Sequence, residues 1–234
     1  MPPTDKLIVA LDFGSSAQAF AMVATLSASA RFYKVGLQLL TAEGPAVVRE
    51  LVARGKEVFL DLKLHEIPHS VAGAVAAAGV LGVSMVTVHA SGGSAVLRAA
   101  VEAARPYPGL RVLALTVITS MRDDDLAAIG VNASVTEQVV RLARLAEAAG
   151  CHGVVASAQE ARLLRALLPP GMLIVTPGTQ LLTDAKTDQA RVATPSDALR
   201  WGATHLVIGR SITGASDPLA ALAAIRAQMD EADL

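Results

Sequence analysis

The chain has 234 residues, of which 53% are hydrophobic and only 3% aromatic, so we expect a core of aliphatic side chains. Its net charge is −1 at pH 7, which excludes the strongly basic surface with which proteins attract nucleic acids. The longest apolar segments contain glycine and are too short to span a bilayer, so we expect no membrane as a partner either.

A single cysteine, Cys151, excludes an internal disulfide and is typical of a protein from a reducing compartment. No secretory signal precedes the first apolar segment. We therefore expect a cytoplasmic protein in which Cys151 packs in the core.

Short apolar segments alternate along the chain with longer segments of helix length. The short segments are rich in Val, Ile and Leu, as buried strands are. We predict strands at 6–13, 31–36, 57–62, 84–89, 111–118, 153–156, 172–176 and 205–208. We predict helices at 17–27, 39–54, 70–81, 95–104, 136–149, 158–168, 195–201 and 218–229.

Signals of helix ends support this division. Thr194-Pro195 and Asp217-Pro218 combine a capping residue with proline at the first helical position. Glycine follows several predicted helices, where a left-handed cap is favoured: Gly55, Gly82, Gly150 and Gly202.

Eight strands alternating with eight helices predict an α/β fold with a parallel sheet, either closed into a barrel or doubly wound. No Gly-x-Gly-x-x-Gly follows the first strand, which argues against a dinucleotide-binding sheet. The number of strands and the length favour one (β/α)8 barrel (TIM barrel) as a single domain over residues 1–234.

Ionisable side chains gather at the ends of the first three strands. Asp12, Lys34, Asp61 and Lys63 would meet at one mouth of a barrel, where active sites of this architecture lie. Asp61 and Lys63 point the same way because a strand alternates its faces, and Glu66 can add a negative charge nearby. Charges after a strand commonly form a solvated loop edge, and one pair would be structural. Four at one rim favour a functional site.

The histidines do not indicate a metal site. His65, His69, His152 and His205 lack the spacing of metal ligands. The lysines would compete with a cation for the nearby carboxylates, so we predict a site without metal. His89 has two open interpretations, a core histidine or a contact near the substrate.

The other half of the rim favours phosphate binding. Pro177-Gly178 and Gly209-Arg210 follow strands seven and eight, where barrels of this type bind phosphate, and a guanidinium matches phosphate oxygens. The polar loop 179–191 is either a surface connection or a lid. A ligand would thus have a phosphate on this side and its reacting end at strands one to three, with a polar ring near Thr119 and Ser120.

Nine motifs now fall in order along the chain. They are Ala-Leu-Asp12, Lys34-Val-Gly, Asp61-Leu-Lys63-x-His-x-Ile-Pro, Val-His89-Ala-Ser-Gly-Gly, Leu-Thr-Val-Ile-Thr119-Ser, Ser-Ala-Gln-Glu, Thr-Pro-Gly178, Asp-Gln189 and Ile-Gly209-Arg210-Ser-Ile-Thr. Together they resemble the bacterial orotidine 5′-phosphate decarboxylase family over residues 7 to about 220.

The resemblance implies decarboxylation of orotidine 5′-phosphate to UMP, without cofactor, in a homodimer with shared active sites. By similarity, Lys63 protonates C6 as CO₂ leaves, Asp61 lies against the substrate carboxylate, and Lys34 and Glu66 complete the catalytic set. The resemblance implies these substrate-binding residues: Asp12, Lys34, Asp61, Leu62, Lys63, Leu64, His65, Glu66, Ile67, Pro68, His69, Ser70, Thr119, Ser120, Pro177, Gln180, Gln189, Gly209 and Arg210.

The chain departs from the family pattern in three places. Glu66 stands where the family has Asp, which in the family enters the neighbouring subunit's site. His69-Ser70 replaces Asn-Thr, and the serine keeps a hydroxyl. Gln180 replaces an arginine after Pro177-Gly178, so one phosphate contact is weaker or comes from another residue such as Lys186 or Arg191.

Two other functions compete with this interpretation. One is that of a related barrel, a sugar-phosphate decarboxylase or aldolase that stabilises an enediolate with Mg²⁺. Those relatives lack the lysine equivalent to Lys34. The other is a barrel that binds a nucleotide without turnover. This function would not explain why a lysine is present at position 63.

Overall fold

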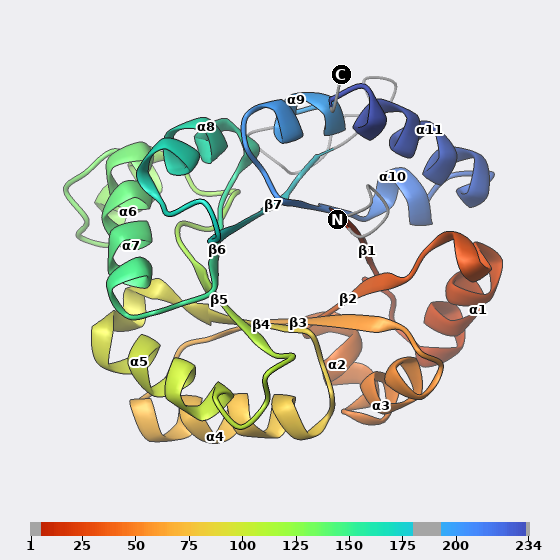
Figure 1. Cartoon of the computed structure of the whole chain (residues 1–234), viewed down its shortest axis with the longest axis horizontal. Coiled ribbons are helices and arrows are strands. Elements are labelled where there is room, and N and C mark those ends of the chain that lie inside the picture. Colours follow the sequence, from red (N-terminus) through yellow and green to blue (C-terminus); the bar gives the residue numbers. More distant parts are fainter. Residues whose placement is uncertain (1–5, 180–192, 233–234) are drawn as a thin grey trace.

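Eight parallel strands form a closed barrel in the computed structural model, which describes residues 6–179 and 193–232. The strands pair in chain order, and β8 pairs with β1 to close the ring (Figure 1). They are β1 (Leu7–Ala10), β2 (Phe32–Gly36), β3 (Glu57–Leu64), β4 (Met85–His89), β5 (Arg111–Leu115), β6 (Gly153–Val155), β7 (Leu173–Pro177) and β8 (His205–Ile208). The predicted (β/α)8 barrel is confirmed.

Helices surround the ring of strands on all sides (Figure 1). They are α1 (Ser16–Leu26), α2 (Leu37–Glu43), α3 (Ala46–Ala53), α4 (Pro68–Val80), α5 (Gly93–Ala104), α6 (Asp123–Ala128), α7 (Val135–Ala148), α8 (Ala158–Leu167), α9 (Pro195–Arg200), α10 (Arg210–Thr213) and α11 (Pro218–Asp230). Two short 3₁₀ helices, η2 (Ser27–Ser29) and η3 (Ala90–Gly92), follow α1 and β4.

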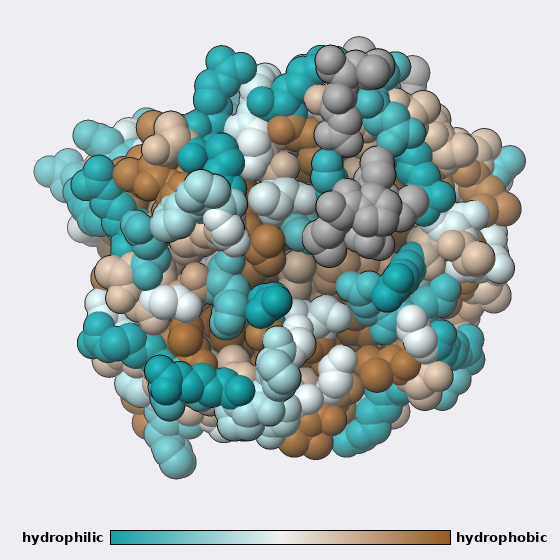
Figure 2. Space-filling view, in the orientation of Figure 1, coloured by the Kyte–Doolittle hydropathy of each residue, from teal (hydrophilic) through white to brown (hydrophobic). Residues whose placement is uncertain are grey.

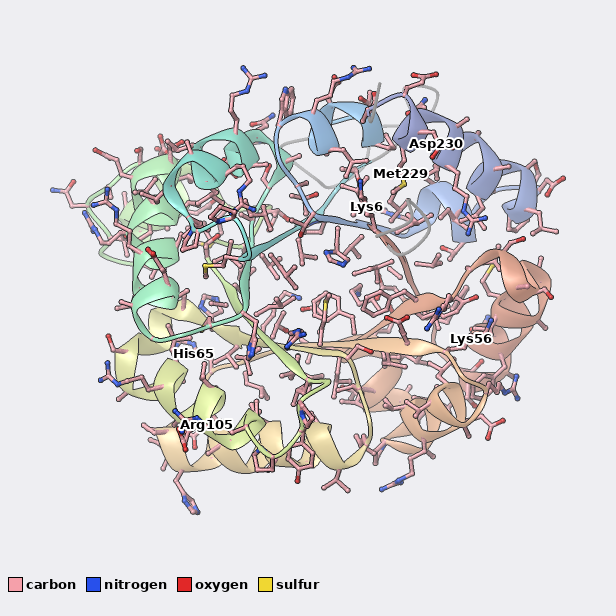
Figure 3. The ribbon with its side chains drawn as sticks, viewed as in Figure 1. Lys6, Lys56, His65, Arg105, Met229 and Asp230 are labelled. Atoms are coloured by element: carbon pink, nitrogen blue, oxygen red, sulfur yellow. The ribbon has the colours of Figure 1, made fainter. Side chains whose placement is uncertain are left out.

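The strands bury both of their faces, and the two faces belong to different parts of the core. Ile8 and Ala10 of β1 point into the barrel, where side chains fill the ring of strands (Figure 3). Leu7 and Val9 point outward and pack against the helices. This burial explains why the strand segments read as continuous apolar runs.

One predicted helix is wrong in its extent. The segment 39–54 forms two helices, α2 and α3, because Gly44 adopts a φ of 66° and Pro45 provides no backbone N–H. The short helices α6 and α10 were not expected, since neither has an apolar repeat. Strands β1 and β5 end three residues earlier than predicted.

The cap and core predictions agree with the structure. Gly55, Gly82, Gly150 and Gly202 all have positive φ angles, between 70° and 100°. Cys151 is buried, and burial raises the pKa of its thiol to about 12.

A helix must be both long and apolar to span a membrane. None of the helices of the described residues combines the length and apolar character needed to cross a bilayer. On the face shown in Figure 2, hydrophobic residues occur in separate patches among hydrophilic ones.

Candidate active site

An irregularity in β3 shapes the mouth of the barrel. Leu60 pairs with Val86 of β4, and the next pair joins Leu64 to Val88. Three residues, 61–63, therefore lie opposite the single residue Thr87. Within this bulge Lys63 has a φ of 51°, a left-handed conformation that in the described residues only one other non-glycine residue adopts.

Asp12, Lys34, Asp61 and Lys63 form a chain of alternating charge. Lys34 Nζ lies 2.8 Å from Asp12 Oδ1 and 3.9 Å from Asp61 Oδ2, and Lys63 Nζ lies 2.8 Å from the same Asp61 oxygen. The two inner side chains, Lys34 and Asp61, are only 11% and 12% exposed. Buried charges of this kind are tolerated because each faces an opposite charge.

A cavity of about 590 Å³ opens beside this charge array. Its volume is in the range of sites for small ligands. Phe59, Leu115, Val155 and Val207 line it and belong to the apolar interior of the barrel. The charges thus lie at the edge of an apolar chamber, where electrostatic interactions are stronger than in water.

The rest of the cavity wall includes residues from the regions expected to bind a polar ring and a phosphate. The residues from the predicted ring and phosphate regions that line it are Thr119, Ser120, Pro177, Gly178, Thr179, Gly209, Arg210 and Ser211. Arg210 begins α10 directly after β8, and Asp12 follows β1 on the adjacent strand. Gln180 and Gln189, together with Lys186, Arg191 and nearly all of the predicted lid, lie outside the described residues.

The stretch after Lys63 does not line this cavity within one chain. Leu62 and Leu64 pack against the core between strands and helices. His65, Glu66, Ile67, His69 and Ser70 are exposed, and Pro68 is partly buried at the start of α4. Their assignment to substrate binding stays a prediction.

Glu66 does not join the charge array in the single chain. Hydrogen bonds from the Ser70 hydroxyl and then from the Ile67 backbone N–H lower the pKa of this fully exposed carboxylate. Glu66 lies two residues before α4 begins at Pro68, where a negative charge is favourable for the start of a helix.

His89 lies close to the array but not in the cavity. Its ring stacks on that of His65, with centroids 5.0 Å apart, and its Nδ1 is 2.6 Å from Ser91 Oγ. Burial lowers the pKa of His89, and His65 and Lys63 lower it further. These effects favour the neutral form of the histidine, and it does not line the cavity.

Besides the apolar lining, three further residues of the site were missed from the sequence. Gln38, on α2, lines the cavity beside Lys34. Gly36 leaves room for the Lys34 ammonium, because an added Cβ would lie 2.9 Å from Nζ. Thr87 bonds to Asp61 beneath the cavity. Of these three, only Thr87 could have been suspected from the sequence. It precedes His89 by two positions, so the two side chains share one face of the strand.

Comparison with known proteins agrees with this geometry. The model of the orotidine 5′-phosphate decarboxylase / HUMPS family matches residues 5–225. The chain belongs to this family. The matched range includes every residue that lines the cavity.

Individual members of the family are similar over nearly their whole length. Orotidine 5′-phosphate decarboxylase from Chromohalobacter salexigens is 50% identical over 96% of both chains. That from Anaeromyxobacter dehalogenans is 47% identical over 97% of this chain and 99% of the relative. The crystal structure of the Lactobacillus acidophilus enzyme superimposes with a TM-score of 0.86 at 34% identity, covering 96% of this chain and 98% of that one.

Proposed function

We propose that the chain decarboxylates orotidine 5′-phosphate to UMP in pyrimidine synthesis, in the cytoplasm and without a cofactor. The observation that carries the proposal is the array Asp12–Lys34–Asp61–Lys63 at the edge of an apolar cavity. Family membership and the match to named decarboxylases support it.

The array can favour loss of CO₂ in two ways. Asp61 is held beside the substrate carboxylate, so the two negative charges repel each other. This repulsion is relieved when CO₂ departs. The C6–carboxyl bond breaks and its electron pair stays on C6, beside the fixed Lys63 ammonium. Lys63 Nζ donates a proton to C6, which gives UMP, and the resulting amine regains its proton from solvent.

The remaining polar residues would orient the substrate. Arg210 and Gly209 bind the phosphate, Asp12 and Lys34 bind the ribose, and Thr119 and Ser120 face the pyrimidine. Binding energy from a phosphate remote from C6 can be used to hold the reacting end in place and exclude water.

A Mg²⁺-dependent reaction of a related barrel fits this site less well. Asp12 and Asp61 each have an ammonium nitrogen 2.8 Å away, so a cation would have to displace Lys34 or Lys63. Within residues 6–179 and 193–232, no group of three or more His, Cys, Asp or Glu side chains is arranged to hold a metal ion.

We further propose a homodimer in which residues 64–70 of one subunit complete the cavity of the other. This stretch is implied in substrate binding yet lies outside the cavity of its own chain. Ile67 and Leu37 are 60% and 57% exposed, as apolar side chains at an interface would be in an isolated subunit.

The test is an assay of the purified protein with orotidine 5′-phosphate in metal-free buffer. We expect UMP and CO₂ at a rate that EDTA does not change, and a dimer in sedimentation at the assay concentration. Activity that disappears on chelation and returns with Mg²⁺ would support the related reaction instead. A fully active monomer would rule out shared sites.

A Lys63→Ala control separates chemistry from binding. The variant should lose turnover but still bind UMP, because the phosphate and pyrimidine contacts remain. Normal turnover would remove Lys63 from its role.

A further inference from the structure

Thr87 lies in β4, next to β3, the strand that carries Asp61 and Lys63 of the charge array. It is on the inward face of β4, between Met85 and His89, and is 0% exposed. It does not line the cavity and so cannot touch a ligand there. Any effect of Thr87 on the reaction must therefore pass through its neighbours.

The Thr87 hydroxyl connects Asp61 to Lys63. It accepts a hydrogen bond of 2.8 Å from the Lys63 backbone N–H and is 2.9 Å from Asp61 Oδ1. An N–H can only donate, so the single hydroxyl proton is available for the carboxylate. The direction of both hydrogen bonds follows from this chemistry.

Each hydrogen bond holds one part of the site that would otherwise be free to move. With Oδ1 held by Thr87, the carboxylate of Asp61 presents Oδ2 to Lys63 Nζ at 2.8 Å and to Lys34 Nζ at 3.9 Å. The bond to the Lys63 N–H holds that residue at a φ of 51°, which a lysine avoids without such support. Thr87 is also the one residue of β4 opposite the three-residue bulge.

We propose that Thr87 is a positioning residue, which orients the Asp61 carboxylate and fixes the bulge that directs Lys63 toward it. The proposal rests on the proposed decarboxylation, in which Asp61 and Lys63 act on the carboxylate and on C6. Because Thr87 acts on the reacting end alone, its loss affects turnover and leaves phosphate binding intact.

The test compares Thr87→Val with Thr87→Ser. Valine keeps the branched shape that suits a strand but has no hydroxyl, whereas serine keeps the hydroxyl. We expect kcat of Thr87→Val to fall about 10- to 100-fold, the loss typical of a hydrogen bond to a charged group. UMP affinity should stay within about threefold, and Thr87→Ser should recover most of kcat.

The outcomes separate a positioning role from a general structural one. A wild-type kcat in Thr87→Val would overturn the proposal, as would equal loss in both variants or a parallel loss of UMP affinity. Wild-type protein without activity on orotidine 5′-phosphate would instead contradict the proposed function, and this inference with it. If Thr87→Val does not fold, Thr87→Cys, whose thiol is a weak donor, should show the same loss of kcat, and an unchanged kcat would overturn the proposal.

Discussion

At the scale of single residues, the charged side chains were the easiest part of the site to predict. Parallel strands of a barrel all end at one mouth, so charges at three consecutive strand ends had to converge there. The structure brings Asp12, Lys34, Asp61 and Lys63 into one chain of contacts. The residues that make room for these charges and orient them could not be identified in the same way. A glycine or a threonine can occur in a strand for many different structural reasons, so its presence alone does not indicate a role in a site.

Gly36 illustrates such a hidden requirement and provides a prediction. Its φ of −102° suits any residue, so glycine is needed there only for space. A methyl group would lie 2.9 Å from Lys34 Nζ and 3.2 Å from Asp12 Oδ1. The lysine tip can move aside, so Gly36→Ala should fold with nearly unchanged stability. The displaced ammonium should lower kcat/KM by about 10²-fold, the effect of a misplacement of ~1 Å.

Steady-state kinetics and thermal unfolding of Gly36→Ala test this expectation. Gly14→Ala is the matched control, because the nearest atom to its added Cβ is 4.0 Å away. Normal kinetics in Gly36→Ala would mean that the ammonium has room that the structure does not indicate.

At the scale of elements, the barrel could be predicted because the strands are buried on both faces over most of their length and so consist largely of apolar residues. The split between α2 and α3 was missed although Gly44-Pro45 marks it, because the apolar pattern continues across the break. The bulge in β3 left no signal at all. Strand alternation correctly directs Asp61 and Lys63 to the same side, but it contains no indication that a lysine adopts a positive φ.

Helix α4 provides a prediction at this scale, because its two interior glycines lie in different surroundings. A Cβ on Gly79 would lie 2.3 Å from the ring of Tyr107, whereas nothing lies within 4 Å of one on Gly73. Gly73→Ala should stabilise the protein by about 0.5–1 kcal/mol through helix propensity. Gly79→Ala should destabilise it by about 1–3 kcal/mol, because overpacking outweighs that gain.

Urea unfolding of the two variants measures the difference directly. Equal stabilisation by both substitutions would show that Tyr107 moves away at no cost and that the close contact with α4 does not limit stability.

At the scale of the whole molecule, two half-buried histidines, His89 and His152, make stability depend on pH. Burial lowers the pKa of His89, as do His65 and Lys63. Burial and then Arg111 lower the pKa of His152. In the unfolded chain both titrate near 6.5. As the pH falls through 6.5, the unfolded chain therefore binds protons that the folded protein does not, and the free energy of unfolding falls.

Well above pH 6.5 the two histidines are neutral in both the folded and the unfolded protein. There they do not make the free energy of unfolding depend on pH. The free energy of unfolding, measured with urea at pH 7.5, 6.5 and 5.5, should decline toward the acid end. The double variant His89→Gln/His152→Gln should decline less steeply, since glutamine does not titrate. An unchanged slope in that variant would assign the pH dependence to other groups.

The junction of β1 and β8 has a consequence for how the protein acquires its activity. The other strand pairs join consecutive strands, but Leu7 pairs with Leu206, about 200 positions away along the chain. Contacts between such distant positions are the slowest to form, because the chain loses the most entropy in making them. The same junction brings Asp12, which follows β1, and Arg210, which follows β8, to the same cavity. The site therefore cannot assemble before the longest-range pairing has formed, and a newly made chain gains activity only after the ring closes.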